Sequence, residues 1–229
     1  MMLVSPTDPP LYLAEPRDVE GDRPPARLRP FLSQARAVLR WARAYLCSPH
    51  AQLGRDGPVC PYTQPSLDRT LFWLAFHPGA DPAPDRAAAA IGRYRDWFLR
   101  LPPEEGPEAQ YKAILVLFPE LPHSRAPRVV DGVQAALKPA FVSAGLMIGQ
   151  FHAGCAEPAL WNPGFHPLRS PVPLLAIRHM VRTDAAFLVR DAGSLDAYLR
   201  RFGDCVPARL EPVVREAAAR FGMAFARTS

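Results

Sequence analysis

Residues 112–118, KAILVLF, form an unbroken apolar run behind a single lysine. A run of this length and composition is typical of a buried β-strand. Three other stretches have the same character: TLFWLAF (70–76), LMIGQFH (146–152) and VPLLAIRHM (172–180). The sequence therefore predicts a sheet of about four core strands.

Apolar residues at helical spacing lie before, between and after these strands. The expected helices run from Leu28 to before Pro49, over 85–101, from Ser124 to Gly145, and over 194–202 and 208–221. The order α-β-α-β-α-β-β-α-α predicts an α+β fold, in which a single-layer, mostly antiparallel or mixed sheet is packed with helices.

The chain has 229 residues, of which 48% are hydrophobic, and this is enough for one domain with a sizeable core. Residues 1–26 are rich in proline and charge and show no sustained period. We expect them to be an N-terminal arm whose first 20 or so residues add little to the core. Residues 27–229 then form a single α+β domain.

The net charge of +5 comes mainly from arginines scattered over the predicted helices, since Lys112 and Lys138 are the only lysines. This pattern does not favour nucleic-acid binding, which usually needs a basic patch. The sequence contains neither a membrane-spanning apolar run nor a signal peptide at its start, and it predicts a cytoplasmic protein. The four cysteines are widely spaced and form no CxxC pair, so we expect reduced thiols. Homodimer formation is left open.

The segment between the last two predicted strands concentrates reactive side chains. It holds FHPLRSP (165–171), and with the adjoining strand ends it carries three of the six histidines: His152, His166 and His179. A loop of about twenty residues is uncommon inside a compact domain unless it has a function. Strand alternation places Gln150 and His152 on one face, and the three histidines would converge if the loop folded back.

Three chemical readings of this region stay open. His152 and Cys155 could be ligands of a zinc ion, with His166 and His179 as further candidate ligands. A heme iron would need only one histidine or cysteine ligand in an apolar pocket. Otherwise the histidines are ordinary structural residues.

Two arginines are candidates for carboxylate binding, and the absence of several motifs excludes some classes of activity. Arg169 and Arg178 could each bind a carboxylate, either a heme propionate or a substrate carboxylate. The sequence has no glycine-rich phosphate loop, nucleophile elbow or Ser/His/Asp order. This argues against nucleotide hydrolysis, dinucleotide binding and serine-type hydrolysis. We expect the partner to be a small-molecule substrate.

Four segments carry a resemblance to known families: GPVCPYTQPSLDRTLFWLAF, GLMIGQFHAGC, LWNPGFHPLRSPVPLLAIRHMV and TDAAFL. Over roughly residues 50–190 they look like a small bacterial family of unknown function found near natural-product biosynthesis genes. More distantly, the chain is similar to the YqcI/YcgG family, which includes heme-dependent oxygenases acting on nitrogen of amino acids or guanidines. The chain departs from that pattern at Val59-Cys60-Pro61 and at Leu168-Arg169-Ser170.

The resemblance implies a heme-dependent monooxygenase, an oxidoreductase of natural-product biosynthesis. His166 would be the proximal ligand of the heme iron, with Arg169 and Arg178 as anchors for a propionate or a substrate carboxylate. Gln150, His152 and His179 are then candidates for the substrate pocket. The alternatives are a non-catalytic ligand-binding or accessory protein of a biosynthetic pathway, and a zinc-binding protein.

Overall fold

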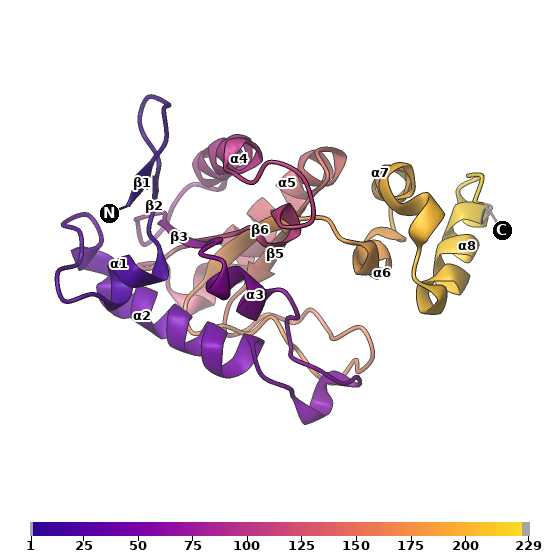
Figure 1. Ribbon diagram of the computed structural model, residues 1–229, viewed down its shortest axis with the longest axis horizontal. Helices are drawn as coiled ribbons and strands as arrows, with labels where there is room; N and C mark the ends of the chain where they lie inside the picture. The colour runs from indigo at the N-terminus through magenta and orange to yellow at the C-terminus, as the bar shows by residue number, and fades with distance from the viewer. Residues whose placement is uncertain (1, 226–229) are drawn as a thin grey trace.

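A four-stranded mixed sheet forms the centre of the computed structural model, which describes residues 2–225 (Figure 1). The strand order is β3 (Phe72–Phe76), β4 (Ala113–Leu117), β6 (Leu174–His179) and β5 (Leu146–Phe151). β3 runs parallel to β4, whereas β6 is antiparallel to both β4 and β5. The predicted α+β class and the four predicted strands are confirmed.

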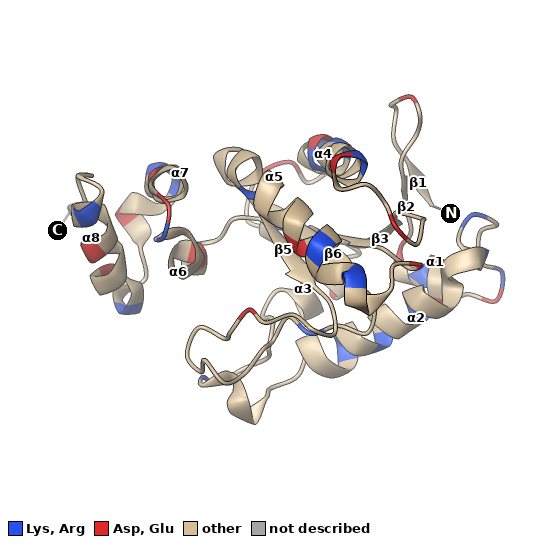
Figure 2. Ribbon diagram, turned by 180° about the vertical axis from the view of Figure 1, so that it is seen from behind, with Lys and Arg blue, Asp and Glu red and all other residues tan. Residues whose placement is uncertain are grey.

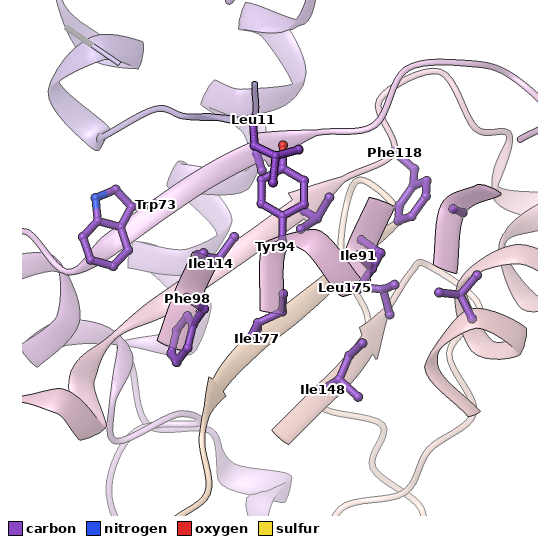
Figure 3. Packing of buried hydrophobic residues seen from close by; sticks show 14 of the residues in the cluster. Leu11, Trp73, Ile91, Tyr94, Phe98, Ile114, Phe118, Ile148, Leu175 and Ile177 are labelled. Carbon is purple, nitrogen blue, oxygen red and sulfur yellow. The ribbon is translucent and has the colours of Figure 1, made fainter. Parts of the chain in front are cut away.

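One face of the sheet is covered by α4 (Pro84–Arg100) and α5 (Gly132–Ser143). Ile114 and Ile177 of the sheet and Ile91 and Phe98 of α4 lie in the same apolar cluster, and each has no exposed surface (Figure 3). Burial of each such side chain stabilises the fold by roughly 1.5–3 kcal/mol. This face is therefore closed by packing.

The opposite face packs against α2 (Leu32–Trp41), which continues as a π-helical turn, Ala42–Leu46, and against α3 (Thr63–Asp68). Leu74 and Leu115 of the sheet cluster there with Val38 and Leu39 of α2. These residues cover the β3 and β4 side of the face.

The N-terminal residues pack into the core, so the prediction that they add little to it is wrong. β1 (Leu3–Val4) pairs with β2 (Tyr12–Leu13), and α1 (Pro16–Glu20) follows. Leu13, Ala14 and Val19 have no exposed surface. Ala14 also exchanges two 2.8 Å backbone hydrogen bonds with Leu74, because the edge strand β3 needs partners for its free amide and carbonyl groups.

The C-terminal helices form a separate apolar cluster at the end of the molecule (Figure 1). They are α6 (Ala185–Leu188), α7 (Ala192–Phe202) and α8 (Glu211–Arg220). Helices such as α4 and α8 carry both basic and acidic residues (Figure 2). Among residues 2–225, no helix has the length and apolar character needed to span a bilayer.

Candidate functional site

The long segment 152–173 folds against residues 47–62, on the side of the sheet opposite α4 and α5 (Figure 1). We call these two segments the loop pair. Asn162 Nδ2 donates to the Gln52 carbonyl at 2.8 Å. Gly54 has φ +76°, and a Cβ on it would lie 2.8 Å from Trp161 Cβ. The close approach of the two loops therefore requires glycine at this position.

A chain of aromatic rings connects the sheet to the loop pair. Trp41 contacts Phe151 edge-on at 5.8 Å and stacks on Tyr45 at 6.0 Å, measured between ring centroids. Tyr45 then meets His50 at 6.0 Å, and His50 stacks on Phe165 at 4.4 Å with 15° between the ring planes. We call these five residues the aromatic run. All of them except Phe165 are only half-buried.

Small residues leave part of the same sheet face accessible. Gly149 of β5 pairs with Ala176 of β6, and both remain half-buried. Strand alternation puts them on the face of Phe151, the sheet end of the aromatic run. Gly149 has no side chain and Ala176 only a methyl group, so the Phe151 ring lies close to the backbone here, with its Cε2 3.3 Å from the position that a Cβ of residue 149 would take.

His166 lies half-buried beside the aromatic run. Its Nδ1 is 3.4 Å from the Glu157 carbonyl oxygen. Because a carbonyl can only accept, this contact needs a proton on Nδ1, and in the neutral imidazole the lone pair is then on Nε2. The next residue is also held, because Tyr45 Oη donates to the Pro167 carbonyl at 3.2 Å. This arrangement gives His166 the tautomer of a metal-ligating imidazole.

Arg169 is exposed and forms no ion pair with any described residue. Its Nε donates to the Cys155 carbonyl at 3.5 Å. Burial raises the pKa of Tyr45, and the nearby Arg169 guanidinium partly opposes this increase. Arg169 thus holds an unneutralised positive charge next to the aromatic run.

Arg178, the other predicted carboxylate anchor, already has a carboxylate partner. Its Nη1 and Nη2 donate to the two oxygens of Asp184 at 2.7 and 2.6 Å. Asp184 is 2% exposed, so the pair is largely buried. Of the two arginines, only Arg169 has a guanidinium free to receive an anion.

Gln150 and His152 fall on the side of the sheet that packs against α5. Gln150 is half-buried on the face of Ile148, which belongs to the α4 and α5 cluster. His152 has 1% exposure, and its Nε2 lies 3.0 Å from Asp131 Oδ1, just before α5. Neither residue joins His166 beneath the sheet.

His179 lies at the far end of the β5–β6 ladder from His152, since it pairs with Leu146, the first residue of β5. Its ring centroid is 5.0 Å from that of Phe98. Burial, followed by the charges of Lys112 and Arg201, lowers the pKa of His179 to about 4. The structure thus does not bring the three histidines together. Within residues 2–225, no three His, Cys, Asp or Glu side chains are grouped to hold a metal ion.

Sequence reasoning missed Trp41, Tyr45, His50 and Phe151. Trp41 and Tyr45 are four residues apart, and this spacing places two rings on one helical face. Their partners come from a distant loop and strand, and no local pattern predicts that meeting. The spacing was the only available signal.

The protein is an α+β protein with a mixed four-stranded sheet and helices on both faces. Its candidate site lies on the sheet face opposite α4 and α5, where the long segment 152–173 meets the aromatic run. Residues 35–212 match the model of a domain of unknown function, DUF6875, and the chain belongs to this family. The match includes all four core strands and both segments of the loop pair. Comparisons with curated proteins and with solved structures gave no significant match.

Proposed function

We propose that the protein binds heme through His166. In this proposal it is a monooxygenase of natural-product biosynthesis that acts on a nitrogen atom of an amino-acid-like or guanidine substrate. The observation that carries the proposal is the His166 imidazole, whose Nδ1 is held by the Glu157 carbonyl while Nε2 stays free. The resemblance to the YqcI/YcgG family supports the same ligand and the same chemistry.

The residues around His166 fit a heme. A heme site needs an axial ligand, a broad apolar surface and, commonly, a cation for the propionates. His166 offers Nε2, the half-exposed rings of Trp41, Tyr45 and Phe151 offer apolar area, and Arg169 offers an unpaired guanidinium. When bound, heme would supply the activation of dioxygen.

The protein's own contribution would be orientation and charge. The hydrogen bond from Tyr45 to the Pro167 carbonyl holds the backbone next to His166, and the contact of Nδ1 with the Glu157 carbonyl orients the imidazole. The Cys155 carbonyl orients Arg169, which would bind a carboxylate of the propionate or the substrate.

A second function has its own supporting observation. The unpaired Arg169 beside stacked aromatic rings suits a flat carboxylated ligand whether or not iron is present. A non-catalytic ligand-binding or accessory protein would need nothing more than these groups.

A test for an oxygenated product distinguishes the oxygenase from the accessory protein. The purified protein is titrated with hemin and then supplied with dioxygen, a reductant and L-arginine or L-lysine. The oxygenase proposal predicts saturable hemin binding and a product one oxygen atom heavier than the substrate. Hemin binding with no product from either L-arginine or L-lysine favours the accessory function. Absence of hemin binding overturns the proposed oxygenase.

A further inference from the structure

Two cysteines lie together at the base of the first segment of the loop pair. The Cys60 amide donates to the Leu46 carbonyl at 2.8 Å, and the Val59 amide donates to the Ser48 carbonyl at 2.9 Å. An antiparallel bridge between Pro49 and Pro58 continues the same pairing. The loop between the two cysteines therefore begins at Cys47 and ends at Cys60, and its two ends lie side by side.

The backbone hydrogen bonds limit how far apart the two cysteines can be. The Leu46 carbonyl directly precedes Cys47, and it accepts the amide proton of Cys60 itself. Standard bond lengths then place the two Cα atoms roughly 4.5–6 Å apart. Disulfide bridges span about the same range of Cα separations.

The side chains have a matching environment. Both thiols are free and half-buried, so a small oxidant can reach them. Burial raises the pKa of Cys47 to about 11, and the Cys60 thiol adds to this increase, as expected for neighbouring sulfurs. Cys155 is buried instead, and Cys205 lies exposed beyond α7.

We propose that Cys47 and Cys60 form a disulfide when a low-molecular-weight disulfide, such as glutathione disulfide, is present. The inference rests on the backbone pairing of the two segments and is independent of heme binding. No other described cysteines are joined by such a pairing.

The reaction is a two-step thiol–disulfide exchange. The Cys60 thiolate attacks one sulfur of glutathione disulfide and releases one glutathione thiolate. The Cys47 thiolate then attacks the Cys60 sulfur and releases the second glutathione. The two protein thiols are oxidised to one disulfide, the oxidant is reduced to two thiols, and the two protons pass to the released glutathione.

The bridge would close the loop that carries His50, Gln52 and Gly54, which contact the long segment 152–173. Closing a loop of this size reduces the conformational freedom of the unfolded chain. We expect the midpoint of thermal unfolding to rise by about 5–10 °C on oxidation.

Trypsin separates the two cysteines, because Arg55 lies between them. The native full-length protein is incubated with glutathione disulfide, free thiols are alkylated, and the digest is analysed by mass spectrometry without reduction. The proposal predicts that peptides 44–55 and 56–69 become linked to each other, while the peptides with Cys155 and Cys205 are not linked to another peptide.

Matched variants complete the test. Cys205→Ser should leave the linked peptide unchanged, and Cys60→Ser should abolish both the link and the gain in melting temperature. Glutathione adducts on Cys47 or Cys60 without a link overturn the proposal, as do links that mainly involve Cys155 or Cys205. The digest of the wild-type protein shows which cysteines are linked even if a variant folds poorly.

Discussion

Arg178 and Asp184 form a two-point ion pair where β6 ends and the C-terminal helices begin. The Nη1–Oδ2 and Nη2–Oδ1 distances are 2.7 and 2.6 Å. Asp184 Oδ2 also accepts the Val181 amide at 2.8 Å, and Arg178 Nη1 donates to the His179 carbonyl at 2.9 Å. The pair therefore fixes the direction in which the chain leaves the sheet.

Removing the Asp184 carboxylate should be costly, because Arg178 would keep a largely buried charge without its partner. We expect Asp184→Ala to lower the free energy of unfolding by about 3 kcal/mol. The matched control is Asp196→Ala, which breaks the exposed i,i+4 pair with Arg200 and should cost less than about 1 kcal/mol. Denaturant unfolding of both variants measures the two losses, and equal losses would contradict this role for Arg178.

The strands could be predicted because each is a short apolar run, as 112–118 shows. The partners of Arg178 and His152 could not, since Asp184 lies in a segment without period and Asp131 comes from another element. The aromatic run could not be predicted either, because Trp41, His50 and Phe151 come together only through tertiary packing. Local patterns therefore predicted the elements and the loop that carries His166, while the pairing of side chains required the folded chain.

The N-terminal segment offers a direct test of core packing. Leu13 has no exposed surface, whereas Val4 is 56% exposed. Leu13→Ala should lower the free energy of unfolding by about 2–5 kcal/mol, because it removes buried methyl groups and leaves a cavity. Val4→Ala should change it by less than about 0.5 kcal/mol. A Leu13→Ala protein as stable as wild type would mean that the segment does not pack as described.

His179 should make the fold sensitive to acid. Its pKa is about 4 in the folded protein, against 6.5 for an ordinary histidine. Between these two pH values the unfolded chain binds a proton that the folded protein does not, so stability is full above about pH 6.5 and falls as the pH drops to 4. The complete loss is about 3 kcal/mol.

The His179→Leu variant removes this titration while keeping an apolar contact with Phe98. We expect its free energy of unfolding to fall less steeply than that of wild type between pH 6.5 and 4. Chemical denaturation at several pH values gives the two slopes. Identical slopes would show that His179 does not contribute to the acid sensitivity.

Arg169 should contribute to ligand binding and not to stability, because it is exposed and forms no ion pair among the described residues. Arg169→Ala should weaken hemin binding about tenfold, as expected from the loss of one charged hydrogen bond. Hemin dimethyl ester lacks the propionate charges and serves as the matched control ligand. An equal loss of affinity for both ligands would contradict a carboxylate contact at Arg169.

The most direct measurement is the absorption spectrum of the protein expressed with a heme precursor, compared with the His166→Ala and His123→Ala variants. His123 is an exposed histidine on the turn His123–Arg125, remote from the loop pair in sequence. The account predicts a Soret band in wild type and His123→Ala, its loss or shift in His166→Ala, and recovery when imidazole is added to that variant. A wild-type protein without Soret absorption, or an unchanged spectrum in His166→Ala, would contradict the assignment of His166 as the heme ligand.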